Sequence, residues 1–475
     1  MPVQPLRFGT DGWRAVIGAD YTMANVRLCA QAVADDVRAR GLADRGLVVG
    51  YDTRFASEHF AAAAAEVLAA NGVPALLCDR PTPTPVASFA VVHQRAAGAV
   101  MITASHNPAI WNGFKVRSDY GGAASPETLA RLEARIADLQ TRGTVWRMPA
   151  DRAEQCGLLR RFDGSPAYSA HVGTLVDLET LRQAGLRVVV DAMYGAGMGW
   201  YPRLIGGGRT AIIELNAERN PYFGGVAPEP IPRNLGRLLQ TVPQVQAQVG
   251  LATDGDADRL GVCDEHGRFI DQLRVYSLLA LYLLEVRGWR GPIVKTISTS
   301  TMLDKLGALY NVPVYETPVG FKYVAPKMLE TNALVGGEES GGYAFRGHIP
   351  ERDGIVAGLF LLDMMVRLER TPSQLVEYLF SKVGPHFYDR LDLHFPAERR
   401  PEISQRLSTA RVTDLEGSPV VRFQTEDGFK WTAADGGWLL IRFSGTEPIM
   451  RIYAETSSPE RVQRLLQQGR ELAGV

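Results

Sequence analysis

A strand–helix–strand pattern occurs three times in this chain, and it restricts the possible fold more than any other feature. The copies cover residues 46–78, 186–215 and 292–316. Each opens with an apolar, mostly β-branched run, continues through a helix that begins near Ser or Gly, and closes with a shorter strand. Each copy is followed by a further apolar run that leads into a polar loop. The pattern predicts three related α/β domains, each contributing one loop at the end of a strand.

The last part of the chain breaks this pattern. From about Phe387 polar and apolar residues alternate, as in 388–395, and a final helix is predicted after 457–460. A chain of 475 residues also exceeds what a single core normally holds. We therefore predict a smaller α+β domain at the carboxyl end. The predicted domains are 1–158, 159–262, 263–383 and 384–475.

Charge and composition limit the classes of partner. Lys and Arg number 51 against 52 Asp and Glu, which argues against nucleic acid or a membrane surface as partner. No apolar run reaches the ~18 residues needed to cross a bilayer, and residues 1–7 lack the form of a signal peptide. The four cysteines are far apart, which predicts buried free thiols in a reducing compartment. These features favour a soluble, cytoplasmic protein. The cysteines are Cys29, Cys78, Cys156 and Cys263.

The first polar loop carries a serine. Residues 98–102 read as a short buried strand, and Thr103–Pro108 follows it directly. Asn107-Pro108 forces a turn, so Ser105 is expected at the carboxyl end of a strand, where open α/β sheets bind ligands. The alternative is an ordinary turn in which Ser105 bonds only its own backbone.

The second polar loop carries three aspartates. Asp254, Asp256 and Asp258 alternate with small residues after the apolar run 249–252. Three carboxylates with few other donors suit Mg²⁺, which takes few protein ligands and prefers a substrate phosphate as another. An EF-hand is excluded because residues 259–262 are strand-like and supply no ligands. A solvated acidic turn is the alternative, but adjacent like charges repel unless a cation neutralises them.

Two further loops offer groups for sugars and phosphates. Residues 336–342 combine flanking glycines with Glu338 and Ser340, which suit sugar hydroxyls, although such turns are also common on surfaces. Residues 442–448 follow another apolar run and place an arginine beside two hydroxyls and a glycine. This set forms a compact oxyanion cradle, and an ordinary Ser-Gly surface turn is the alternative. The predicted phosphate-binding residues are Arg442, Ser444, Gly445 and Thr446.

These four loops, together with Phe8–Arg14, resemble the α-D-phosphohexomutase superfamily, whose members interconvert 1- and 6-phosphosugars. The motifs stand in the family's order and span nearly the whole chain. The resemblance implies an α/β fold with the four-domain heart-shaped architecture of the family. Three related mixed-sheet α/β domains would be joined to a smaller α+β domain at the carboxyl end.

The resemblance also implies roles for single residues. Ser105 would carry a phosphoryl group whose oxygen completes the shell of one Mg²⁺ per chain with Asp254, Asp256 and Asp258. A substrate hydroxyl would attack to give a 1,6-bisphosphate, glucose 1,6-bisphosphate in the glucose case, which then turns over. Lys115 is the candidate general acid or base, and for that role its pKa is expected to be lowered by desolvation. The alternatives are a solvated lysine at Lys115 and a structural ion-pair partner at Arg14. The catalytic set implied is Ser105, His106, Lys115, Arg14 and Arg259.

The sugar preference rests on segments in the third domain. The sugar loop ends Ser340-Gly341-Gly342, without the histidine common in mannose- and glucosamine-type members. Residues 317–322 and 347–354 resemble segments of glucose-specific mutases, which makes Lys322 and His348 candidate contacts for the sugar or its distal phosphate. An ordinary capped loop histidine is an equal alternative for His348.

The resemblance ranks phosphoglucomutase first, a dual phosphoglucomutase/phosphomannomutase second and phosphoglucosamine mutase third. From a different class, a metal-dependent phosphohydrolase is disfavoured because ester cleavage has no use for a second phosphate cradle. A non-catalytic sugar-phosphate sensor would lack the serine or the aspartates. The partners implied are small hexose phosphates, bound by a monomer or dimer.

Overall fold

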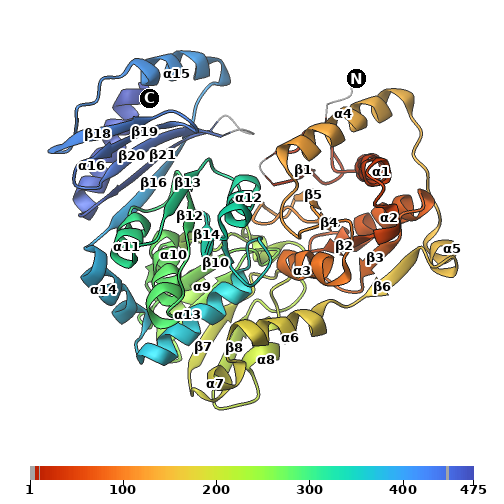
Figure 1. Cartoon of the computed structure of the whole chain (residues 1–475), viewed down its shortest axis with the longest axis horizontal. Coiled ribbons are helices and arrows are strands. Elements are labelled where there is room, and N and C mark those ends of the chain that lie inside the picture. The colour runs from red at the N-terminus through yellow and green to blue at the C-terminus, as the bar shows by residue number, and fades with distance from the viewer. Residues whose placement is uncertain (1–5, 10, 445–448) are drawn as a thin grey trace.

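The computed structural model describes residues 6–9, 11–444 and 449–475, and the chain forms four sheets in sequence order. We number the domains I to IV by these sheets. Domains I and IV form two upper lobes that are joined through domains II and III below (Figure 1). The four sheets confirm the predicted organisation into three α/β domains and a smaller α+β domain at the carboxyl end.

Domain I contains a six-stranded sheet in the order β1-β5-β4-β2-β3-β6. Strands β2, β4, β3 and β6 are parallel, whereas β5 runs antiparallel to both of its neighbours. The strands are β1 (Trp13–Val16), β2 (Leu47–Tyr51), β3 (Ala75–Cys78), β4 (Ala99–Ile102), β5 (Trp111–Arg117) and β6 (Leu159–Phe162). The helices are α1 (Met23–Ala39), α2 (Ser57–Ala70), α3 (Thr84–Gln94), α4 (Pro126–Arg142) and α5 (Ala150–Gln155).

Domain II contains a five-stranded sheet in the order β11-β10-β9-β7-β8. The helix of the second copy forms over Trp200–Ile205. Gly195 lies before it against the aspartate loop, where a Cβ would come within 2.8 Å of the Asp254 carbonyl oxygen. The strands are β7 (Arg187–Asp191), β8 (Ala211–Leu215), β9 (Val249–Thr253), β10 (Leu260–Cys263) and β11 (Phe269–Ile270). The helices are α6 (Ser165–Leu175), α7 (Leu178–Gln183), α8 (Trp200–Ile205) and α9 (Gly236–Gln244).

Domain III contains a four-stranded sheet in the order β13-β12-β14-β15. Its core is continuous with that of domain II, since buried side chains of both domains form one cluster. The strands are β12 (Ile293–Thr296), β13 (Val314–Thr317), β14 (Val335–Gly337) and β15 (Tyr343–Phe345). The helices are α10 (Gln272–Leu281), α11 (Met302–Tyr310), α12 (Phe321–Thr331), α13 (Gly354–Leu368) and α14 (Pro372–Val383).

Domain IV contains an antiparallel sheet in the order β16-β21-β20-β19-β18-β17, covered by two helices. The alternation after Phe387 corresponds to β16, and Ser458 caps the final helix as expected by accepting the Arg461 N–H. The strands are β16 (Phe387–His394), β17 (Asp414–Leu415), β18 (Ser418–Gln424), β19 (Phe429–Ala433), β20 (Trp438–Phe443) and β21 (Ile449–Thr456). The helices are α15 (Arg400–Thr409) and α16 (Pro459–Ala473).

The first three domains share one topology. The strand orders β5-β4-β2-β3, β10-β9-β7-β8 and β15-β14-β12-β13 correspond strand for strand. In each, a central parallel strand is followed by a loop and an antiparallel return strand. The serine, aspartate and sugar loops are these three connections. The repeated pattern in the sequence therefore places each loop at the same corner of its domain.

Two expectations, on the domain boundaries and on the cysteines, need correction. The predicted boundaries after 158 and 262 cut through sheets, because β6 pairs with β3 in domain I and β11 pairs with β10 in domain II. Such short strands carry little signal of their own. Of the four cysteines, Cys156 is exposed at the end of α5, whereas the other three are buried.

No described helix is both long enough and apolar enough for a membrane span.

Candidate active site

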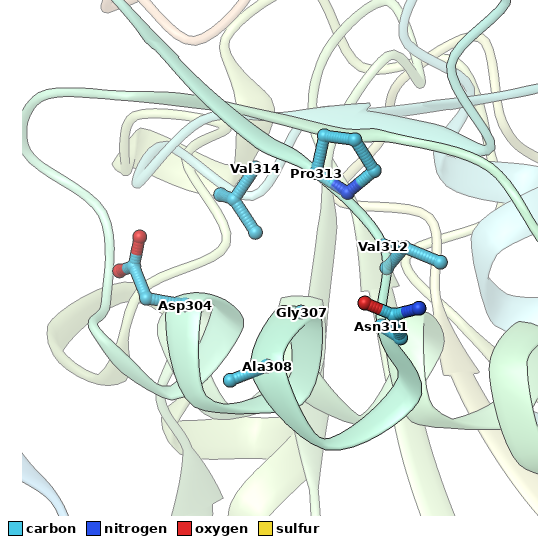
Figure 2. A pocket seen from close by; sticks show the side chains of 7 residues that line it. All are labelled: Asp304, Gly307, Ala308, Asn311, Val312, Pro313 and Val314. Atoms are coloured by element: carbon cyan, nitrogen blue, oxygen red, sulfur yellow. The ribbon is translucent and has the colours of Figure 1, made fainter.

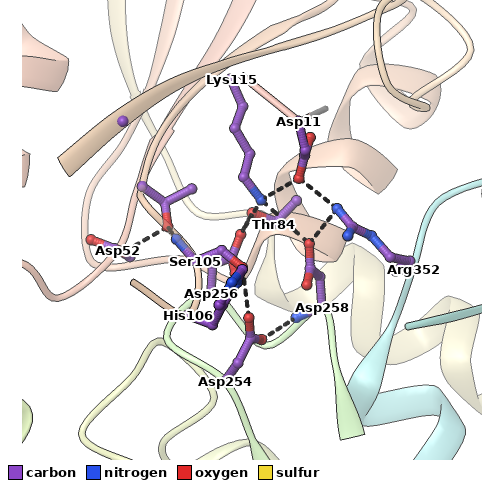
Figure 3. A network of polar contacts seen from close by, with 12 residues as sticks. Asp11, Asp52, Thr84, Ser105, His106, Lys115, Asp254, Asp256, Asp258 and Arg352 are labelled. Atoms are coloured by element: carbon purple, nitrogen blue, oxygen red, sulfur yellow. Dashed lines mark hydrogen bonds and ion pairs between the residues drawn. The ribbon is translucent and has the colours of Figure 1, made fainter. Parts of the chain in front are cut away.

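The serine loop and the aspartate loop meet at the boundary of domains I and II (Figure 3). The Ser105 hydroxyl donates to Asp254 Oδ2 at 2.8 Å, and the Thr84 hydroxyl of α3 donates to Asp256 Oδ2 at 2.6 Å. Gly255 makes this approach possible, since a Cβ there would lie 2.5 Å from the Ser105 carbonyl oxygen. The glycine between the first two aspartates is thus required by the neighbouring loop.

Arg54 holds the serine loop in its conformation. Ser105 has a φ of 53°, a left-handed conformation that non-glycine residues rarely adopt. The buried Arg54 guanidinium uses all five donors: Nε binds Asp52, and its terminal nitrogens donate to the carbonyl oxygens of Ser105, Asn107, Pro108 and Trp111. Sequence reasoning missed Arg54. The sequence feature that could have pointed to it is the pair Asp52 and Arg54, which follows the buried strand β2.

The aspartate triad is built to hold a cation. Its three carboxylates are buried, and one oxygen of each lies within 4.8 Å of the others. In the described part of the chain, Asp256 Oδ1 and Asp258 Oδ1 are buried without a hydrogen-bond partner. Burial and the two neighbouring carboxylates raise the pKa of Asp254 well above its usual value. Unsatisfied carboxylate oxygens that repel one another fit a hard divalent cation such as Mg²⁺.

Lys115 lies inside an ionic network. Its ammonium group is 2.8 Å from Asp11, 2.8 Å from Asp256 and 3.3 Å from Asp258. Burial alone would lower the pKa of Lys115, but these three carboxylates outweigh it and the pKa is raised. The expected desolvation is present, while the expected lowering of the pKa is wrong. A solvated lysine at this position is also excluded.

Arg352 links this network to domain III. Its guanidinium lies 2.5 Å from Asp11, 2.8 Å from Asp258 and 3.6 Å from Glu338. It therefore contacts a carboxylate from each of the first three domains. Sequence reasoning missed both Asp11 and Arg352, although each stands in a segment that carried the family resemblance.

The other predicted catalytic residues surround the serine. Arg14 donates to the Asn107 side chain at 2.6 Å, and His106 Nδ1 lies 3.5 Å from Ser105 Oγ. Arg259 lies 3.9 Å from Asp258 and from Glu229. Burial, reinforced by the nearby cations, lowers the pKa of His106 well below its usual value. The imidazole is therefore neutral near pH 7.

The sugar loop sends neighbouring side chains in different directions. Glu338 is buried beside Arg352, and burial raises the pKa of Glu338. Among the residues that the structure describes, Ser340 Oγ is buried and unpartnered. Glu339 instead accepts bonds from Tyr388 at 2.7 Å and Arg390 at 2.9 Å, both on β16. The loop thus combines two candidate ligand groups with a contact to domain IV.

Lys322 and His348 have different surroundings. Lys322 lies in the first turn of α12, with its amino group 5.4 Å from the centre of the Tyr323 ring. The His348 side chain is fully buried, with one ring nitrogen 2.9 Å from Asp353 and the other 3.1 Å from His171. Both of its polar atoms are thus engaged between domains II and III, which corrects its expected contact with the sugar or phosphate.

The phosphate-binding loop begins at the end of β20. Arg442 Nε donates to Asp427 at 3.0 Å, and the Ser444 N–H donates to the Ile449 carbonyl oxygen at 2.8 Å. Gly445 and Thr446 lie outside the described residues. The described part of the loop therefore has its arginine held by a neighbouring carboxylate.

A surface cavity of about 480 Å³ lies elsewhere in domain III, between α11 and β13 (Figure 2). Its lining includes Asp304, whose carboxylate pairs with the buried Lys295. The cavity shares no lining residue with the predicted site. It is lined by Asp304, Gly307, Ala308, Asn311, Val312, Pro313 and Val314.

Each of the four domains matches a domain of one known protein family. The matching descriptions are phosphoglucomutase/phosphomannomutase alpha/beta/alpha domains I, II and III and the family's C-terminal domain. They cover residues 5–143, 166–267, 272–383 and 401–472 respectively. The four matches follow one another in the order of the four sheets.

Individual relatives agree over the full length. A Thermococcus kodakarensis phosphoglucomutase/phosphomannomutase is 32% identical over 98% of both chains. A probable phosphoglucosamine mutase of Methanothermobacter thermautotrophicus is 31% identical over 97% of this chain and 96% of its own. A solved structure from Thermus thermophilus, assigned as a phosphomannomutase, is 34% identical with a TM-score of 0.84 and covers 99% of this chain and 100% of its own. The chain therefore belongs to the phosphoglucomutase/phosphomannomutase family and is a phosphohexomutase.

Proposed function

We propose that the enzyme moves a phosphoryl group reversibly between the 1- and 6-positions of a hexose phosphate, through a phosphoserine at Ser105. The observation that carries this proposal is the 2.8 Å contact between the Ser105 hydroxyl and Asp254 of the buried triad. A serine aimed at a cation site suits phosphoryl transfer, because the transferring group carries negative charge. Glucose 1-phosphate and glucose 6-phosphate are the proposed substrates.

In the transfer step, a substrate hydroxyl attacks phosphorus and the bond from phosphorus to Ser105 Oγ breaks. The hydroxyl proton ends on Ser105 Oγ. His106, whose Nδ1 lies 3.5 Å from that oxygen, is one candidate to carry it, and Lys115, bonded to Asp256 of the triad, is the candidate general acid or base. Arg14 and Arg259 offset charge on the phosphoryl group. Mg²⁺, held by Asp254, Asp256, Asp258 and a phosphoserine oxygen, would supply Lewis-acid polarisation of that group.

The remaining loops account for a mutase rather than a single transfer. Glu338 and Ser340 would bind ring hydroxyls, and Arg442 with Ser444 would bind the phosphate that is not reacting; the buried, unpartnered Ser340 Oγ and the Arg442 guanidinium held by Asp427 support these roles. Lys322 is a further candidate for that phosphate or the sugar. The 1,6-bisphosphate formed first must turn over so that its other phosphate can return to Ser105. A second phosphate site serves this exchange and has no use in hydrolysis.

The reaction class is tested with glucose 1-phosphate, Mg²⁺ and a trace of glucose 1,6-bisphosphate. We expect glucose 6-phosphate to form without inorganic phosphate. Release of inorganic phosphate in place of the isomer would indicate a phosphohydrolase and refute the proposal.

The sugar preference is tested by comparing kcat/KM for glucose, mannose and glucosamine 1-phosphates. A dual phosphoglucomutase/phosphomannomutase is the second candidate, favoured by the relative of that name at 32% identity. Phosphoglucosamine mutase is the third, favoured by the relative at 31% identity. Glucose 1-phosphate is expected to give the highest value, and a higher value for either other sugar would replace our assignment.

A further inference from the structure

One carboxylate in domain IV joins the phosphate-binding loop to a loop of domain III. Asp427 Oδ1 accepts a bond from Arg442 Nε at 3.0 Å, and Asp427 Oδ2 accepts the Val319 backbone N–H at 2.7 Å. Val319 belongs to segment 317–322, which ends at Lys322. Asp427 therefore bridges two segments, from different domains, that are both predicted to contact the ligand.

The position of Asp427 follows from the turn that carries it. Residues 425–428 connect β18 to β19, and the turn ends in Asp427-Gly428. Gly428 has a φ of 115°, and a Cβ there would lie 2.8 Å from the Ile441 carbonyl oxygen and 3.3 Å from the Arg442 Cβ. The glycine thus lets the turn pack against β20. As a consequence, the Asp427 carboxylate lies beside the Arg442 guanidinium.

The contact has a specific effect on a guanidinium. With Nε bonded to Asp427, the two terminal nitrogens form the edge through which Arg442 can bind a phosphate in bidentate fashion. The side chains of Arg442 and Asp427 are only 13% and 24% exposed, so the pair is partly shielded from solvent. An arginine held in this way loses less conformational freedom when it binds an anion.

We propose that Asp427 is a positioning residue, which orients Arg442 for the substrate phosphate. The identity of the substrate rests on the proposed function. The effect of Asp427 on binding of a sugar phosphate does not require turnover, so the two can be tested apart.

The first test measures glucose 6-phosphate binding by isothermal titration calorimetry and KM in both directions. Asp427→Ala should weaken binding about tenfold and raise KM for glucose 1-phosphate and glucose 6-phosphate by similar factors, with a smaller change in kcat. Asp427→Glu restores a carboxylate and should recover part of the loss. Glu426→Ala, an exposed neighbour in the same turn, is the matched control and should bind as the wild type does.

The second test is a double-mutant cycle with Arg442→Ala. If Asp427 acts through Arg442, then Asp427→Ala should cause no further loss of binding in the Arg442→Ala background. Wild-type affinity in Asp427→Ala, or a full additional tenfold loss in the double variant, would overturn the proposal. A wild-type enzyme that binds glucose 6-phosphate without isomerising it would refute only the proposed function. A wild-type enzyme that does not bind it would contradict both.

Discussion

At the scale of single residues, the site depends on side chains whose conformations are enforced by their neighbours. Ser105 adopts a left-handed conformation that costs on the order of 1–3 kcal/mol. Hydrogen bonds from the Arg54 guanidinium to the carbonyl oxygens of Ser105 and Asn107 hold the loop in this conformation. Asp256 shows the same dependence. Burial alone would raise its pKa, but Lys115 and the Thr84 hydroxyl lower it below its usual value. The nucleophile Ser105 and the metal ligand Asp256 are therefore both preorganised before a substrate arrives.

Removal of the nucleophile should abolish the reaction and spare the fold. Ser105→Ala deletes one hydroxyl and its bond to Asp254, so thermal stability should change little. Activity should fall by about three orders of magnitude or more, because no other group can carry the phosphoryl. Intact-mass spectrometry should find one added phosphate on the wild type and none on the variant. Turnover near the wild-type rate would rule out the phosphoserine route.

A change in the triad should alter the metal requirement. In Asp256→Asn the amide keeps an acceptor for Thr84 but loses the negative charge that faces Lys115 and the cation. The Mg²⁺ concentration for half-maximal activity should rise at least about tenfold. Asp119→Asn, at an exposed carboxylate paired with Arg45, is the control and should leave it unchanged. Full activity of the wild type after chelation would contradict the metal assignment.

At the scale of elements, the three α/β domains supply equivalent connections, and the contacts between these connections make the site. The serine and aspartate loops occupy the same position after β4 and β9, and they touch at Gly255. The sugar loop, after β14, reaches the same centre through Glu338 and Arg352. Repetition of one topology thus brings distant segments together at the same corner of each sheet.

The contact between the two loops is tested by Gly255→Ala. The new Cβ would lie 2.5 Å from the Ser105 carbonyl oxygen, so the loops must separate. Activity should fall at least about tenfold and stability by roughly 1–3 kcal/mol. Gly236→Ala at the start of α9, where nothing lies within 4 Å of the added Cβ, should change neither. An unaffected rate in Gly255→Ala would show that the spacing of the loops is not critical.

At the scale of the whole molecule, domain IV is docked on domain III by buried polar contacts. Glu455 of domain IV accepts bonds from the Thr301 N–H at 2.9 Å and from the Ser300 hydroxyl, both in domain III. Lys430 donates to the Ile297 carbonyl oxygen at 2.6 Å and to Glu316 at 2.9 Å. Burial, together with the charge of Lys295, lowers the pKa of Lys430 to about 8. The interface therefore contains a group whose charge opposes folding.

This group predicts a pH dependence of stability. Between pH 8 and the ordinary lysine value near 10.4, the unfolded chain binds more protons than the folded chain, so the Lys430 contribution to stability rises with pH. The gain amounts to about 3 kcal/mol at most and is absent below pH 8. Urea unfolding at pH 7.5 and pH 10 should show this rise in the wild type relative to Lys430→Met. Equal pH slopes for the two proteins would refute the assignment.

The sequence determined the strands, the turns and the chemical type of each loop, because these depend on residues that are neighbours in the chain. Ser105 and the three aspartates could be predicted for this reason, as could the four-domain architecture. Only the tertiary structure decided which distant groups meet. Arg54 on the serine loop, Arg352 at the centre of the network, Asp427 beside Arg442 and the burial of His348 all depend on contacts between segments far apart in the chain. The raised pKa of Lys115 has the same origin, since Coulomb interactions depend on distances in space and the nearby carboxylates come from two domains.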